Sequence, residues 1–353
     1  MAHSTADVAA LRPGATAAEL ERLAPAWDEL ASSLPSPMQQ LAWLQAAVAL
    51  PGLSLHALAL DDGSAVAPLE ARQGRLEAAT VSRLYEPVDL LWRDGEALGR
   101  LADALARLRV PLLLRRVPAA SPSPRALEAA YGRRAITAVR PQPALPVLEL
   151  ATCSQGAEAV LNRGRRSDLR RARRLAGELG EVEFQLLSPA PADASRLLSV
   201  ALDVEARGWK GRAGTALAQD ATRLPFYRRY TLERAAAGAL RLAFLRIDGR
   251  PVAMQIAVEH ANSLWLLKIG YDEAFARCSP GQLLLAEVIR LSATGGLHSI
   301  EFLGSAAPWT REWTRVERPC VAAAFYPLRP RSALPLAHDA GQILGRKLAA
   351  RSA

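Results

Sequence analysis

Three strand-like segments follow one another closely between residues 240 and 271, and a helical segment comes next. Two-residue turns at Asp248-Gly249 and Asn262-Ser263 separate the segments, as in β-hairpins. Such short turns pair consecutive strands antiparallel, and a helix over residues 280–292 must bury its apolar side on one face of the sheet. The arrangement predicts an α/β fold with a twisted, mixed and largely antiparallel sheet flanked by helices.

The first half of the chain repeats part of this pattern. Residues 62–67 (DGSAVA) match residues 248–253 (DGRPVA), and each turn has apolar strands on both sides. A further strand and a helix follow both copies. Hairpins with Asp-Gly turns are common, so six residues alone are weak support, but the shared order favours two tandem domains of the same fold.

The proline-rich segment at residues 140–146 (RPQPALP) is the best candidate for a domain boundary. Its three prolines favour an extended connector over a helix. We therefore expect a first domain over residues 1–145, a second domain over residues 150–330 and a helical tail over residues 331–353.

The chain is basic, with a formal net charge of +9. A surface of this charge favours anionic partners, such as a phosphorylated cofactor, nucleic acid or an acidic carrier protein. Arginine supplies nearly all of the positive charge, because Lys210, Lys268 and Lys347 are the only lysines. A lysine retained against this background indicates a task that arginine cannot perform, for example presenting a compact ammonium group.

Several classes of protein lack support in the sequence. The three cysteines are far apart and the five histidines show no metal-ligand spacing, so we expect neither a disulfide framework nor a metal. There is no GxSxG nucleophile elbow and no GxGxxG fingerprint. There is also no secretory signal and no apolar stretch long enough for a membrane span, and we expect a cytoplasmic protein.

The junction between the third strand and the helix is a candidate anion site. Ser279 stands at the N-cap, Pro280 at the first helical position, and Gly281 leaves space in the first turn. The free N–H groups and the helix dipole suit a pyrophosphate, and Arg277 can add a bidentate contact. A well-capped helix without a ligand is the alternative.

Polar residues at the end of the third strand form a second candidate group. Lys268 interrupts an apolar run, so its ammonium group must reach solvent, a carboxylate or an anionic ligand. Asp272 and Glu301 are the candidate carboxylate partners, and Tyr271 points to the other face of the strand. A surface lysine at a strand end is the alternative.

Two further segments gather polar residues. A glycine-rich loop carries Glu205, Trp209 and Lys210 and is a candidate lid or substrate contact, with an ordinary connecting loop as the alternative. Residues 163–174 contain seven arginines, and Ser167 can cap a helix that exposes them. Such a helix suits the phosphates of RNA or of a nucleotide, or an acidic carrier protein, and a solvated helix face is equally consistent.

Together these segments resemble the GNAT superfamily, and more narrowly the CelD/BcsL-like (BioF-like) acetyltransferase-domain proteins, relatives of the Fem-type aminoacyl transferases. The similar segments within residues 35–313 are SPMQQLAWLQAA, RRSDLRRARRLAGELGEVEF, WKGRAGTAL with PFYRRY, VAMQIA, KIGYDEAFARCSPGQLLLAEVIR and IEFLGSAAPWTREWT. Trp309-Thr310 stands where many relatives have a Tyr-Lys pair.

The resemblance implies tandem GNAT-like domains with the acyl-donor site in the second one. The donor would be acetyl-CoA or another acyl-CoA, and an amine or hydroxyl acceptor would take the acyl group directly. The acceptor would be a small molecule, a saccharide or a peptide, in a cleft shaped by a degenerate first domain. The residues expected at the donor pyrophosphate are Arg277, Ser279, Pro280, Gly281 and Gln282.

For the chemistry, the resemblance suggests Asp272 or Glu301 as the general base and Tyr271 as the acid that protonates the leaving thiolate, with Glu205 acting through water as another base. The residues expected to contact the substrate are Glu205, Trp209, Lys210 and Lys268. Two alternatives stay open: a donor carried by tRNA or by an acyl carrier protein and held by the arginine-rich helix, or an inactive scaffold in envelope or polysaccharide assembly.

Overall fold

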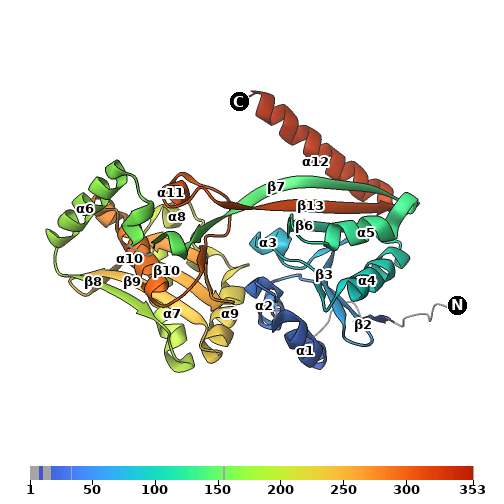
Figure 1. Ribbon diagram of the computed structural model, residues 1–353, viewed down its shortest axis with the longest axis horizontal. Coiled ribbons are helices and arrows are strands. Elements are labelled where there is room, and N and C mark those ends of the chain that lie inside the picture. Colours follow the sequence, from blue (N-terminus) through green and yellow to red (C-terminus); the bar gives the residue numbers. More distant parts are fainter. Residues whose placement is uncertain (1–7, 11–16, 33, 154–155, 353) are drawn as a thin grey trace.

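The computed structural model describes residues 8–10, 17–32, 34–153 and 156–352 (Figure 1). The strands of the first half are β1 Val8–Ala10, β2 Leu55–Leu60, β3 Ala65–Arg72, β4 Arg75–Ala78, β5 Leu91–Trp92, β6 Leu112–Pro118 and β7 Ala135–Glu149. Those of the second half are β8 Val182–Leu187, β9 Leu240–Ile247, β10 Arg250–His260, β11 Ser263–Tyr271, β12 Ser299–Glu301 and β13 Glu317–Pro327.

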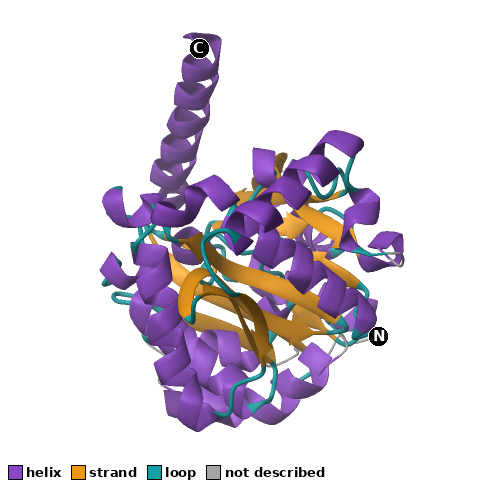
Figure 2. Cartoon of the chain, turned by 90° about the vertical axis from the view of Figure 1, so that its left-hand side faces the viewer, coloured by secondary structure: helices purple, strands orange, loops and turns teal. Residues whose placement is uncertain are grey.

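The helices of the first half are α1 Ala17–Ser32, α2 Leu41–Ala47, α3 Val81–Leu84, α4 Gly95–Arg107 and α5 Ser123–Tyr131. Those of the second half are α6 Arg163–Gly177, α7 Pro191–Ala206, α8 Trp209–Arg212, α9 Leu224–Ala236, α10 Pro280–Thr294, α11 Pro308–Arg311 and α12 Ala333–Ser352, and the 3₁₀ segment η6 Glu273–Cys278 precedes α10. Figure 2 shows helices on both faces of the sheet and α12 standing away from the body.

The strands form one sheet in the order β1-β2-β3-β4-β6-β13-β7-β12-β11-β10-β9-β8, with β5 paired to β3. Only the β4–β6 and β11–β12 pairs in the described chain are parallel. Each half therefore has an antiparallel three-strand meander, a helical crossover and a parallel strand, and both Asp-Gly turns join the first two strands of their meander. The predicted α/β class and its duplicated arrangement are confirmed.

Strands β7 and β13 connect the two halves. The segment expected as a connector, residues 140–146, belongs to β7, which pairs with β13 along most of its length and with β12 at residues 147–149. Although β13 comes late in the chain, it also pairs with β6 of the first half. Figure 1 shows the two long strands running side by side. We propose that the two domains divide near residues 145–150 and that β13, although late in the chain, belongs to the sheet of the first half.

One hydrophobic core extends across both halves, and in the second half it lies on one face of the sheet. Trp43 of α2 is fully buried, and its ring lies 4.7 Å from that of Phe226 and 4.9 Å from that of Tyr230, both on α9. A second core fills the other face of the second-half sheet, beneath α6 and α10. The second-half sheet is therefore enclosed between α7 and α9 on one side and α6 and α10 on the other.

Ser279 stands at the predicted N-cap position of α10, whereas the predicted cap of α6, Ser167, is wrong. Asn162 caps α6, because its Oδ1 accepts a hydrogen bond from the Arg165 N–H at 2.9 Å, and Ser167 lies inside the helix. Ser279 stands at the start of α10 with φ 45°, and its hydroxyl makes no capping hydrogen bond. The left-handed backbone at Ser279 turns the chain sharply between η6 and α10.

Candidate functional site

The edge of β11 is open beside α10. Strand β12 pairs only with the first three residues of β11, whereas β10 pairs with β11 from end to end. Along the open part, the Ile269 carbonyl accepts a hydrogen bond from the Nζ atom of Lys210 at 2.7 Å. Because the N–H and C=O of a strand residue point to the same side, the Ile269 N–H also faces this open edge.

A cavity of about 560 Å³ lies along the open strand, and we call it the edge cavity. Its lining comes from the end of α7, from α8, from β10 and β11, and from η6, α10 and α11. These residues are Glu205, Gly208, Trp209, Lys210, Met254, Gln255, Ile269, Gly270, Tyr271, Ala276, Ser279, Gly281, Gln282, Leu285 and Trp309. The predicted donor turn and the predicted substrate loop thus meet in one cavity.

The first turn of α10 forms one end of this cavity. A Cβ atom added to Gly281 would lie 3.5 Å from Cδ1 of Tyr271, an ordinary contact, so a small side chain fits there. Gln282 is held by Trp313, whose Nε1 donates to its Oε1 at 2.7 Å. Pro280 has no N–H, and the N–H groups of Gln282 and Leu283 donate to the Ser279 carbonyl. The Gly281 N–H and the helix dipole are therefore what this end offers to an anion.

The loop after α7 is tightly fixed to β11. Lys210 Nζ lies 2.9 Å from Glu205 Oε1, and the other oxygen of this buried carboxylate accepts the Leu217 N–H at 2.8 Å. A Cβ atom on Gly270 would lie only 2.9 Å from Cα of Glu205. Trp209 is 54% exposed at the rim. The loop therefore forms an anchored wall of the cavity with one exposed aromatic side chain.

A smaller cavity of about 230 Å³ adjoins the first, and we call it the lysine cavity. Its lining residues are Glu205, Trp209, Lys210, Thr215, Leu217, Arg223 and Lys268. The Nζ atom of Lys268 lies 4.9 Å from the centre of the Tyr227 ring. Burial lowers the pKa of Lys268, and the nearby carboxyl of Glu86 opposes this effect.

Two of the three proposed base carboxylates, Asp272 and Glu301, lie outside both cavities. Asp272 caps η6 and pairs with Arg207 at 2.9 Å and Arg250 at 2.6 Å. Glu301 is buried and pairs with Arg318 at 3.0 Å. Neither carboxylate pairs with Lys268, contrary to the expectation from the sequence.

The remaining predicted donor residues differ in their positions. Arg277 is exposed on η6 and does not line the edge cavity, and Pro280 is buried at the start of α10. Ser279, Gly281 and Gln282 line the cavity together with Tyr271.

Glu86, from the first half, is a buried acid that the sequence did not single out. Burial raises its pKa to about 7, and the positive charges that oppose this rise belong to Lys268 and Arg116. Arg116 is fully buried, donates to the Gly304 carbonyl at 2.6 Å and stacks on Tyr85 at 4.2 Å. The first half thus contributes charged groups next to Lys268.

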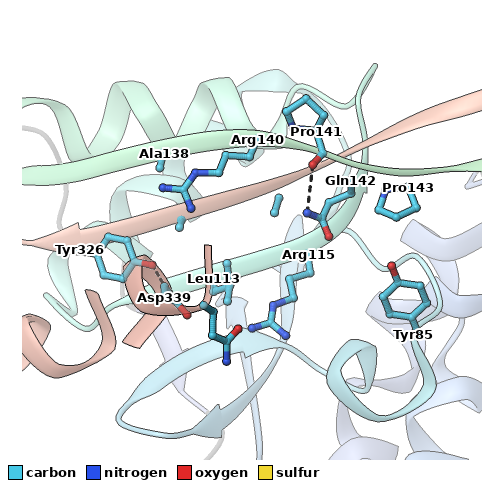
Figure 3. Close-up of a pocket in the computed structure, with 13 residues that line it drawn as sticks. Tyr85, Leu113, Arg115, Ala138, Arg140, Pro141, Gln142, Pro143, Tyr326 and Asp339 are labelled. Atoms are coloured by element: carbon cyan, nitrogen blue, oxygen red, sulfur yellow. Dashed lines mark hydrogen bonds between the residues drawn. The ribbon is translucent and has the colours of Figure 1, made fainter. Parts of the chain in front are cut away.

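A third cavity, of about 560 Å³, lies on the first-half sheet beneath α12 (Figure 3). Arg115 and Arg140 line it from β6 and β7. Asp339 of α12 is held by Arg75 at 2.6 Å and by the hydroxyl of Tyr326. The second-half cavities adjoin both the open edge of β11 and the first turn of α10, so they are the stronger candidate for group transfer.

Within the described residues, no three His, Cys, Asp or Glu side chains gather as a metal site. The same part of the chain contains no helix with the length and apolar character needed to cross a membrane.

Comparison with known proteins finds a family match in the second half of the chain. Residues 163–311 match a family model described as an acetyltransferase (GNAT) domain. No curated protein shows significant sequence similarity to the chain.

Solved structures share the fold over nearly the whole chain. The C-terminal DUF2156 domain of an Agrobacterium fabrum protein has a TM-score of 0.60 at 12% identity, covering 91% of this chain and 96% of that one. L-PGS from Bacillus licheniformis has a TM-score of 0.57 at 13% identity, covering 92% and 96%. FemX has a TM-score of 0.54 at 12% identity, covering 90% and 97%.

Proposed function

The chain carries a GNAT acyltransferase domain in its second half, and we propose that this domain transfers an acyl group from acyl-CoA to an amine or hydroxyl acceptor. The observation that carries the proposal is the open edge of β11, which runs beside a cavity that reaches the first turn of α10. An open strand edge pairs with extended chains that carry amide groups, as the pantetheine arm of CoA does. The helix N-terminus suits the pyrophosphate of the same molecule.

In this proposal the donor supplies an activated acyl group, and the chain positions and polarises it. The Ile269 N–H faces the open edge and is a donor for the acyl carbonyl oxygen. Tyr271 lines the cavity and is the acid for the leaving thiolate. Holding donor and acceptor together provides effective molarities of roughly 10⁵–10⁸ M, so a general base has a smaller task.

The carboxylates of the site fit positioning roles better than proton transfer. Asp272 and Glu301 point into ion pairs outside the cavities. Glu205 lines both cavities, but each of its oxygens is already hydrogen-bonded, one to Lys210 and the other to Leu217. We therefore propose that Glu205 and Lys210 fix the wall that faces the acyl group.

One observation favours the alternative donor, an acyl or aminoacyl group carried by tRNA or by an acyl carrier protein. Helix α6, with its exposed arginines, packs against η6 and α10 beside the donor turn. Binding to such a polyanion would weaken steeply with salt, because arginine–phosphate contacts release counterions.

The test is calorimetric titration of the full chain with acetyl-CoA, using wild type, Gly281→Ala and Gly281→Glu. We expect one-to-one binding by wild type and by Gly281→Ala, since the added methyl group makes an ordinary contact. Gly281→Glu should lose binding, because it places a bulky carboxylate where the pyrophosphate lies, while its thermal midpoint stays near that of wild type.

Equal affinity of wild type and Gly281→Glu contradicts the assigned donor turn. Absence of acetyl-CoA binding by the folded wild-type chain contradicts the acyl-CoA proposal and favours the carrier-bound donors.

A further inference from the structure

The lysine cavity contains two of the three lysines of the chain. Lys210 and Lys268 line it together with Arg223, in a sequence whose other basic residues are nearly all arginine. The two lysines are distant from each other in sequence, because Lys210 belongs to α8 and Lys268 to β11. Their meeting in one small cavity indicates a binding surface that uses compact ammonium groups.

The charges in this cavity do not balance. Lys210 pairs with Glu205 at 2.9 Å, and Arg223 pairs with Asp220 at 2.5 Å. For Lys268 no carboxylate of the described residues lies within 4.0 Å, and its ammonium group rests over the Tyr227 ring. Lys268 therefore faces the cavity without an ion-pair partner, and burial raises the pKa of Glu86, the acid that acts on it most strongly, to about 7. An anionic ligand would stabilise this ammonium group.

The positive charge of Lys268 lies close to the open edge of β11. Lys268 directly precedes Ile269, whose N–H faces the edge cavity. The two cavities share Glu205, Trp209 and Lys210 as lining residues. A ligand held at Lys268 therefore lies next to the place proposed for the acyl group.

We propose that the acceptor is an amine that also carries a carboxylate, such as an amino acid or the end of a peptide, and that Lys268 binds this carboxylate in the lysine cavity. The inference rests on the proposed function. The small cavity and its single ammonium group without an ion-pair partner favour a carboxylate over a phosphate dianion. In the transfer the amine nitrogen forms a C–N bond with the acyl carbon, and the C–S bond of the donor breaks. The proton lost by the amine is balanced by the proton that the leaving thiolate gains to become a thiol.

The probe pair is N-acetylglycine, the product of acetyl transfer to the simplest such acceptor, and its neutral amide, N-acetylglycinamide. Their binding to the full chain is measured by ligand-observed NMR, which needs no donor. We expect wild type to bind the acid at least about tenfold more tightly than the amide, a difference of about 1.4 kcal/mol.

The variants test the assignment to Lys268. Lys268→Met should remove the preference for the acid, and Glu86→Gln should keep it, because that change leaves the ammonium group in place. Arg228→Met is the matched control: it removes one exposed positive charge of α9 and should leave the preference unchanged.

Equal binding of acid and amide by wild type, or binding of neither, overturns the proposal, and this comparison does not depend on any variant folding. Survival of the preference in folded Lys268→Met overturns the role of Lys268. Acetyl-CoA titration is scored separately. A carboxylate preference in a chain that does not bind acetyl-CoA refutes the proposed donor and leaves the carboxylate site standing.

Discussion

The Nζ atom of Lys210 donates hydrogen bonds both to the Ile269 carbonyl, at 2.7 Å, and to Glu205 Oε1, at 2.9 Å. One ammonium group therefore ties α8 to the open edge of β11 and to the last turn of α7. The carboxylate of Glu205 is 2% exposed, so this lysine also neutralises a buried charge. The loop that looked like a lid in the sequence is anchored at its base.

Replacing Lys210 by Met should weaken the fold and the site together. We expect a loss of roughly 1–3 kcal/mol in the free energy of unfolding, because a buried carboxylate is left without its cation. We also expect weaker acetyl-CoA binding, because the wall of the edge cavity loses its anchor. Chemical denaturation and calorimetric titration measure the two effects.

Arg212→Met is the matched control for this prediction. Arg212 lies in the same short helix, but its ion pair with Glu273 is on the surface, where such pairs contribute about 0–1 kcal/mol. Equal stability losses in the two variants would show that Lys210 has no special structural role.

Gly270 should tolerate no side chain. A Cβ atom at this position would lie 2.9 Å from Cα and 3.1 Å from Cβ of Glu205, so α7 has to move away from β11. We expect Gly270→Ala to destabilise the chain by about 1–3 kcal/mol, the usual cost of overpacking. Gly281→Ala, with its contact at 3.5 Å, should stay within about 0.5–1 kcal/mol of wild type in the same denaturation experiment. A reversed order would contradict the packing described here.

The sequence predicts the elements whose signals are local. The second-half meander and α10 appear where the short turns, the proline at the first helical position and the apolar periodicity indicate them. The three prolines in residues 140–146 favour a connector, whereas in the structure these residues belong to strand β7. In the described chain β12 pairs with β7 only at residues 147–149, so the proline-containing part before them has a free edge on that side, and prolines are tolerated at such an edge. The pairing of β7 with β13 joins residues nearly two hundred positions apart, which no local pattern reveals.

The candidate site shows the same limit. The polar turn at Ser279 and the interrupted strand at Lys268 are visible in the sequence, but their partners are not. Local spacing suggested Asp272 for Lys268, whereas the structure brings Glu86 from the other half of the chain toward it. Asp272 forms ion pairs with two arginines instead. Because arginine is so abundant in this chain, the sequence does not reveal which arginine pairs with a given acid.

The shared core predicts that the two halves unfold together. Trp43 of α2 packs its ring against Phe226 and Tyr230 of α9 and donates from Nε1 to Thr80 Oγ1 at 3.0 Å. Trp43→Ala should cost about 3–5 kcal/mol while preserving a single transition. Exposed Trp209→Ala is the control and should change the free energy of unfolding by less than about 0.5 kcal/mol. Two separate transitions in wild type, seen by fluorescence and circular dichroism, would contradict a common core.

Glu86 should make stability depend on pH in a defined window. Its pKa rises from 4.5 to about 7 in the folded chain, first because it is buried, against the opposing charges of Lys268 and Arg116. Between these two values the folded state keeps a proton that the unfolded state has released. The contribution of Glu86 to stability is therefore lost as the pH rises from about 4.5 to about 7.

The amide in Glu86→Gln does not ionise. The free energy of unfolding of this variant should therefore rise relative to that of wild type as the pH increases through the window, and the full difference should persist above pH 7. One pKa unit corresponds to about 1.36 kcal/mol, and we expect a relative change of roughly 1–3 kcal/mol between the two ends. Urea denaturation of both proteins across the pH range measures the difference in free energy of unfolding. A difference that stays constant would mean that folding does not raise the pKa of Glu86. A difference that moves toward wild type with rising pH would mean that folding lowers this pKa, as in an ion pair with Lys268.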